Sequence, residues 1–134
     1  LVAFEVDGAT GSGLVAFEVD APPSFVLGCL ESFESYPEMI PVVRHVELLS
    51  RTPTARGMLA RLNYKISKFW IDLTVVHRID RAESVIRFDL DNSCSKLVLH
   101  EAFGFWQLER LPGGDGGDRT RVWLRASLRA NALL

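Results

Sequence analysis

Polar and apolar residues alternate over most of the chain after residue 42. The alternating segments predict strands at about 42–50, 55–66, 69–80, 84–91, 97–111 and 119–132. Successive side chains of a strand point to opposite faces, so a period of two indicates an antiparallel sheet that is covered on one side. Ser67-Lys68 and the Gly-rich residues 113–117 provide short connections of the kind that join hairpins. The pattern therefore predicts an α+β domain dominated by a curved antiparallel sheet.

The same alternation assigns one face of each strand to the interior. The candidates for this inner face are Met58, Leu62, Tyr64, Leu73, Val75, His77, Phe88, Leu90, Trp106 and Leu124. Ligand pockets are mostly apolar and contain few polar groups, so this set is also the predicted wall of a ligand-binding cavity. Aromatic residues on such a face fit a packed core equally well.

Two short helices are expected between the first strand and the sheet. Pro22 and Pro23 suit the first turn of a helix, where a missing N–H group costs nothing. Apolar residues then recur four apart, as Phe25, Cys29 and Phe33 and as Val26 and Leu30. A second, very short helix is bracketed by Pro37 and Pro41. We interpret Tyr36 as a lock for the junction that follows, and Met39 as a gate beside the cavity.

A heptapeptide at residues 1–7 recurs unchanged at 14–20, after the Gly-rich residues 8–13. Repeat architectures need units of about 20 to 50 residues and at least about three of them, so this duplication does not build one. We take 14–134 as the domain and 1–13 as a duplicated strand plus linker. The extra strand is an addition foreign to the natural domain, one arm of a local hairpin, or the arm of a strand-swapped homodimer.

Composition limits the classes of partner and compartment. The chain has 134 residues, is 48% hydrophobic and carries a formal charge of −2, which fits one globular domain and argues against DNA as a partner. Cys29 and Cys94 lack metal-ligand spacing. They are predicted to be buried thiols in a reducing compartment, either the cytoplasm or the interior of a mitochondrion or plastid. No metal or cofactor is expected.

His77 is the main candidate for chemistry, because it lies on an otherwise apolar face between Val75 and Ile79. It is either a buried structural histidine or a polar anchor that binds a quinone or ketone oxygen. His100 is a second candidate for the same role, and His45 is predicted to lie on the surface. The serines have no Gly-x-Ser-x-Gly context, so no catalytic residue is assigned.

Arginines recur on the outer face of the last strand, at Arg121, Arg125 and Arg129. One interpretation is a solvated strand face. The other is a docking surface for anionic lipid headgroups or ribosomal RNA, since a row of cations binds phosphate without sequence specificity.

Two segments carry a family resemblance. Residues 33–41 contain an aromatic-x-x-Tyr-Pro-x-x-x-Pro stretch, and Gly104, Trp106 and Leu108 form Gly-x-Trp-x-Leu. Together with the order of the elements, they resemble the START-like helix-grip superfamily (SRPBCC), and within it the polyketide cyclase/dehydrase and coenzyme-Q-binding branch. The resemblance covers residues 14–134.

The resemblance implies a sheet that grips its helices, closed by a long C-terminal helix over a hydrophobic cavity. The sequence stops at residues 131–134, directly after the last strand, so this helix is expected to be missing, either truncated or supplied by a partner. The implied function is transport or chaperoning of a lipid or prenylated quinone. The alternatives are a polyketide aromatase/cyclase that uses His77 and Tyr64, and a module that docks on the ribosome or another partner.

Overall fold

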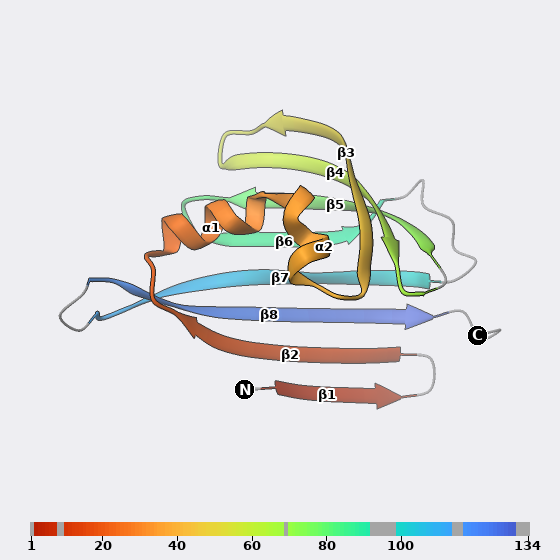
Figure 1. Ribbon diagram of the computed structural model, residues 1–134, viewed down its shortest axis with the longest axis horizontal. Helices are drawn as coiled ribbons and strands as arrows, with labels where there is room; N and C mark the ends of the chain where they lie inside the picture. Colours follow the sequence, from red (N-terminus) through yellow and green to blue (C-terminus); the bar gives the residue numbers. More distant parts are fainter. Residues whose placement is uncertain (1, 8–9, 69, 92–98, 114–116, 131–134) are drawn as a thin grey trace.

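An antiparallel sheet forms the body of the protein in the computed structural model, which describes residues 2–7, 10–68, 70–91, 99–113 and 117–130 (Figure 1). Its eight described strands lie in the order β1-β2-β8-β7-β6-β5-β4-β3. They are β1 (Val2–Asp7), β2 (Thr10–Val19), β3 (Val43–Pro53), β4 (Gly57–Ile66), β5 (Ile71–Asp80), β6 (Val85–Leu90), β7 (Leu99–Leu111) and β8 (Arg119–Ala130). The strands predicted after residue 42 are confirmed within the described residues, with shifts of a few residues at their ends. Residues 69, 97–98 and 131–132 of the predicted strands lie outside the described residues.

The first strand predicted for the domain pairs with the last one. β2 lies antiparallel to β8, with Val15 opposite Leu124 and Phe17 opposite Val122. From β3 to β8 each strand pairs with the next one along the chain, as the short predicted turns require. One turn is longer than predicted, because Trp70 has a φ of 53° and β5 begins only at Ile71.

The first heptapeptide forms the edge of the sheet and lies mainly beside Thr10 to Gly13, which precede the second copy. β1 pairs with β2 antiparallel, with Val2 opposite Val15 and Asp7 opposite Thr10. This is the arrangement of a local hairpin. The predicted linker at 8–13 is too long, since Thr10 to Gly13 already belong to β2 and pair with β8. Glycine tolerates extended backbone, and the two neighbouring strands supply the hydrogen bonds.

Three short helical segments lie across one face of the sheet (Figure 1). They are α1 (Pro23–Glu31), the 3-10 helix η1 (Phe33–Ser35) and α2 (Tyr36–Met39). α1 buries Val26, Leu27 and Leu30, whereas Phe25 and Cys29 are exposed. Adjacent residues differ by about 100° around a helix, so only one of the two predicted apolar rows faces the sheet.

The exposure of Cys29 corrects the prediction of a buried thiol, and Cys94 lies outside the described residues.

The core lies between these helices and the inner face of the sheet. Its largest fully buried apolar side chains come from four different elements and are Phe33, Leu62, Ile86 and Val122. Thr120 is also fully buried, and its hydroxyl donates to the carbonyl oxygen of Ala21 at 2.6 Å. That bond ties β8 to the segment that leads into α1. The helices are therefore held against the inner face of the sheet by apolar packing and by this hydrogen bond.

Candidate functional site

The residues proposed for the cavity wall all come from the inner side of β4 to β8. Leu62, Tyr64, Leu73, His77 and Leu90 are buried. Met58, Val75 and Trp106 are partly buried and pack against the core, while Phe88 and Leu124 are partly exposed. The alternation thus predicted their direction correctly. Their contact with a ligand remains a prediction.

A hydrogen-bonded pair of polar side chains lies inside this apolar wall. The Tyr64 hydroxyl is 2.8 Å from Nε2 of His77, and both side chains are buried. The register of β4 and β5 places His77 opposite Ala60 and Tyr64 opposite Leu73. The tyrosine therefore reaches diagonally across the two strands. The small side chain of Ala60 opposite His77 leaves room for this approach.

Aromatic rings surround the His77 imidazole. Its centroid lies 4.9 Å from that of Phe33, 5.9 Å from that of Tyr64 and 5.8 Å from that of Phe88. Phe33 comes from η1, whereas Phe88 lies directly opposite His77 in β6. This packing leaves only 3% of His77 exposed. Burial lowers the pKa of His77 from 6.5 to about 4, so the imidazole is neutral near pH 7.

One nitrogen of His77 has no partner among the described residues. Nδ1 is buried and makes no hydrogen bond, although Nε2 is bonded to Tyr64. Burial raises the pKa of Tyr64, so its hydroxyl keeps its proton. When Tyr64 donates to Nε2, the neutral ring carries its proton on Nδ1, where it offers a single N–H donor. Such a donor suits a carbonyl or hydroxyl oxygen.

The residues 33–41 hold the helical side of the site together. The Tyr36 hydroxyl donates to the carbonyl oxygen of Leu30 at 2.5 Å and so links α2 to the end of α1. The Tyr36 ring packs edge-on against Phe33 and lies 6.4 Å from the Tyr64 ring. Tyr36 thus joins the two helices, whereas the predicted lock was at the junction between the second helix and the following strand. The contact of Phe33 with His77 was not predicted, because it joins η1 to β5, which are far apart in the sequence.

The other sequence candidates lie elsewhere. Met39 is half exposed at the end of α2, and His45 is exposed on β3. The His100 side chain lies outside the described part of the protein. Among the described side chains, no group of three or more His, Cys, Asp or Glu could hold a metal ion. No described helix combines the length and the hydrophobicity needed to cross a bilayer.

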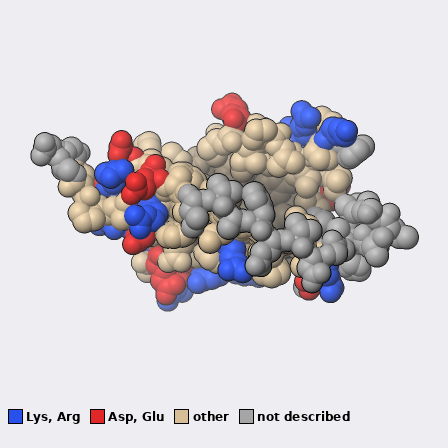
Figure 2. Space-filling model, turned by 90° about the horizontal axis from the view of Figure 1, so that it is seen from below, with Lys and Arg blue, Asp and Glu red and all other residues tan. Residues whose placement is uncertain are grey.

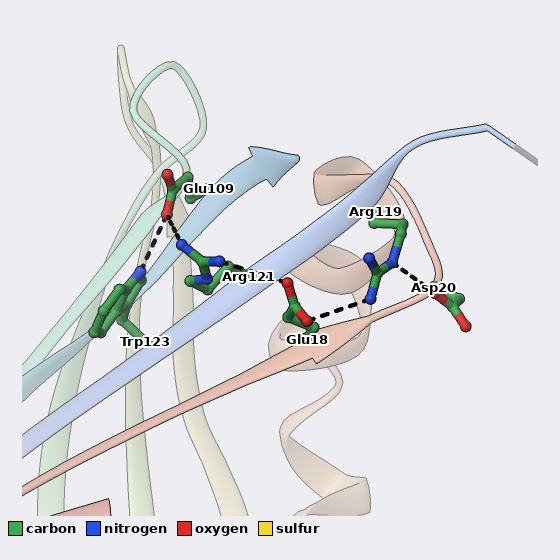
Figure 3. A network of polar contacts seen from close by, with 6 residues as sticks. All are labelled: Glu18, Asp20, Glu109, Arg119, Arg121 and Trp123. Atoms are coloured by element: carbon green, nitrogen blue, oxygen red, sulfur yellow. Dashed lines mark hydrogen bonds and ion pairs between the residues drawn. The ribbon is translucent and has the colours of Figure 1, made fainter. Parts of the chain in front are cut away.

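The arginines of β8 are not equivalent. Arg121 lies between Glu18 at 3.5 Å and Glu109 at 3.7 Å, which come from the two neighbouring strands (Figure 3). Arg119 continues the network to Asp20 at 2.9 Å. Arg121 is therefore largely neutralised within the sheet.

The remaining two arginines of that row, Arg125 and Arg129, are exposed, and no ion pair with another described residue is recorded for them. The ion pairs of Arg121 with Glu18 and Glu109 could not be predicted from the sequence, because they depend on the order of the strands in the sheet. Two shallow hollows also lie on this outer face, and both are lined by Trp123. They are on the opposite side of the sheet from His77.

Comparison with known proteins agrees with the architecture. The model of a family described as polyketide cyclase / dehydrase and lipid transport matches residues 19–133. The Zhui aromatase/cyclase from Streptomyces sp. R1128 superimposes with a TM-score of 0.70 at 20% identity, covering 92% of this chain and 70% of that one. No curated protein matches the sequence.

Two further solved structures are similar. A START superfamily protein from Mycobacterium smegmatis has a TM-score of 0.65 at 16% identity, with 90% of this chain and 77% of that chain covered. A protein from Thermus thermophilus has a TM-score of 0.71 at 18% identity, with 90% and 75% covered. At these identities the likeness concerns the fold.

Proposed function

Because the chain belongs to the polyketide cyclase/dehydrase and lipid transport family and has the START-like helix-grip fold, we propose that it binds a hydrophobic small molecule. The ligand lies between the inner face of the sheet and the helices, and it is a lipid or a prenylated quinone. The protein acts as a carrier or chaperone for it. The observation that carries this proposal is the neutral, buried His77 with one unpartnered nitrogen in an aromatic wall.

The apolar wall supplies the affinity. Burial of each ligand methylene contributes about 0.8 kcal/mol, so a chain of several methylenes binds without any charged contact. Trp106 and Leu124 lie opposite each other in β7 and β8 and are only partly buried. They therefore offer apolar surface beyond the packed core around Phe33. Figure 2 shows the molecule hollowed between the helix side, at the top of the view, and the sheet below.

His77 supplies the orientation. A buried N–H without a partner costs about 1 to 3 kcal/mol, and a ligand oxygen that accepts a hydrogen bond from Nδ1 would remove this cost. Because Nε2 is already bonded to Tyr64, only Nδ1 is available. A single polar contact in an apolar wall favours a ligand with one carbonyl or hydroxyl at its end. This composition is typical of small-molecule sites.

An aromatase/cyclase activity is the second candidate, since the fold resembles that of the Zhui aromatase/cyclase and a Tyr–His pair is able to transfer protons. The electrostatics favour binding instead. A general base works best with a pKa near the working pH, whereas the pKa of His77 is about 4 and that of Tyr64 is raised. Tyr64→Phe separates the two, because an enzyme would lose turnover while a carrier would still retain its ligand.

The test is native mass spectrometry with organic extraction, on the chain purified after exposure to phospholipids and prenylated quinones. We expect one bound lipid or quinone. Leu124→Trp fills the apolar wall and should empty the protein. Arg125→Trp is the matched control, because the neighbouring residue of the same strand points to the outer face.

Two results would overturn the proposal. One is a wild-type chain that remains empty with every lipid and quinone offered. The other is a Leu124→Trp variant that retains ligand as well as Arg125→Trp does.

A further inference from the structure

Exposed apolar side chains gather at one end of the molecule, where two turns meet. The end of α2 exposes Met39 by 49%, and the turn that follows it exposes Val42 by 50%. The other turn joins β4 to β5 and exposes Trp70 by 58%. Large apolar side chains in such a position are exposed at a cost, so their grouping requires a reason. We call Met39, Val42 and Trp70, with Arg44 and Lys68, the tip.

Hydrogen bonds fix the two turns to each other. The N–H of Ser67 donates to the carbonyl oxygen of Val42 at 2.7 Å, and the N–H of Trp70 donates to that of Ser67 at 3.2 Å. The N–H of Val43 donates to the carbonyl oxygen of Ile40 at 2.9 Å. The tip is therefore one hydrogen-bonded unit rather than two independent loops.

The backbone of the second turn is strained in a way that displays Trp70. Ser67 has a φ of 61° and Trp70 a φ of 53°, values that cost free energy for residues other than glycine. An unconstrained loop would adopt a more common backbone conformation. Here the turn keeps the strained conformation with the Trp70 indole in solvent. A turn that holds an indole outward is suited to contact with another surface.

The charges of the tip are mainly positive. Arg44 and Lys68 are exposed beside the apolar residues, and Lys65 is paired with Asp72 at 3.0 Å. Glu38 is the exposed acid on α2. Figure 2 shows Lys and Arg atoms gathered at the upper right, which is the right-hand end of the helix side. Figure 1 places the β4–β5 turn at that end.

We propose that the tip docks onto the surface of a lipid bilayer that contains anionic headgroups. An indole with apolar neighbours and adjacent cations matches the headgroup region, where amphipathic rings and Lys or Arg side chains are favoured. The proposal rests on the proposed function, because a carrier of a lipid-like molecule must collect or deliver it at a membrane. It assigns the membrane contact to the tip and not to Arg121, Arg125 and Arg129.

The experiment is co-sedimentation of the chain with vesicles of phosphatidylcholine, with and without phosphatidylglycerol. We expect Trp70→Ala to weaken binding about tenfold by loss of buried apolar area. Met39→Ser should weaken it as well, and serves if Trp70→Ala folds poorly. Lys68→Gln should weaken binding about fivefold on the anionic vesicles alone, since one cation near such a surface is worth about that factor.

Two matched controls belong to this test. Phe25→Ala removes an aromatic residue that is 62% exposed but lies on α1, away from the tip, and should bind like the wild type. Arg125→Gln removes a cation of the outer face and should also bind like the wild type.

Absence of binding to anionic vesicles would overturn the proposal. The tip would then be expected to contact a protein partner. A loss in Arg125→Gln without a loss in Trp70→Ala would overturn it as well.

Ligand retention is measured separately, so the two proposals fail independently. Trp70→Ala should still carry ligand, because Trp70 is not part of the inner wall. A chain that retains ligand but ignores vesicles would contradict the tip alone. A chain that binds vesicles through Trp70 but never holds a ligand would contradict the proposed function alone.

Discussion

At the scale of the residue, His77 combines the two interpretations that the sequence left open. It is a buried structural histidine, because Tyr64 bonds its Nε2 and three aromatic rings enclose it. It also keeps the property of an anchor, because Nδ1 has no partner among the described residues. Both properties arise because the imidazole lies on an apolar strand face where Tyr64 is its one hydrogen-bond partner among the described residues.

The low pKa of His77 predicts a pH dependence of stability. The folded protein binds the proton less tightly than the unfolded chain, with a pKa of about 4 against 6.5. The free energy of unfolding should thus be fully present above pH 6.5 and fall as the pH approaches 4, by a total on the order of 3 kcal/mol. Urea unfolding across this range measures it.

The control for this prediction is His77→Phe, which should lack the decrease between pH 6.5 and 4. Asp72 and Asp80 have lowered pKa values and lose their contribution to stability from about pH 5 downward, but they are present in both proteins and cancel in the comparison. Parallel pH profiles for wild type and His77→Phe would show that the histidine is not buried in solution.

At the scale of the element, Gly104 determines how closely β7 approaches its neighbours. A Cβ atom there would lie 2.0 Å from the carbonyl oxygen of Arg125 and 2.7 Å from the Phe88 ring. The glycine of the Gly-x-Trp-x-Leu stretch is thus required by close packing. Because Gly104 has no side chain, the Phe88 ring can pack against β7 and also contact His77.

Gly104→Ala should therefore destabilise the protein by about 3 kcal/mol, because the backbone of β8 and the Phe88 ring must both move. Gly28→Ala is the matched control. It lies in α1 with nothing within 4 Å of the added Cβ, and it should stabilise the helix by about 1 kcal/mol. Denaturant midpoints and near-ultraviolet circular dichroism report both effects, and equal midpoints for the two variants would contradict the packing argument.

At the scale of the whole molecule, the duplicated strand adds an edge to a sheet that is otherwise continuous from β2 to β3. β1 pairs with β2 alone, whereas Thr10 to Val15 of β2 are paired with both β1 and β8. The two copies have the same sequence, so either is able to occupy the place beside β8. In the intramolecular hairpin the first copy pairs mainly with Thr10 to Gly13, whereas the second copy pairs with β8.

Deletion of residues 1–9 should consequently leave the domain folded. The unfolding free energy should change by no more than about 2 kcal/mol, since an edge strand pairs on one side only. Light scattering should give a monomer before and after the deletion. A dimer that becomes a monomer on deletion of residues 1–13 would instead support strand swapping.

The sequence by itself determined the strands, their inner and outer faces and the short helices around Pro22 and Pro37, because period two and proline geometry are local properties. It also indicated the family, through residues 33–41 and Gly104. Only the tertiary structure decided which apolar row of α1 is buried and that Glu18 and Glu109 neutralise Arg121. It likewise decided that Tyr64 bonds His77 and that Val42 meets the turn before Trp70. These contacts join residues far apart in the chain. They depend on the register of the strands and on the docking of the helices, and no local sequence pattern encodes either of these.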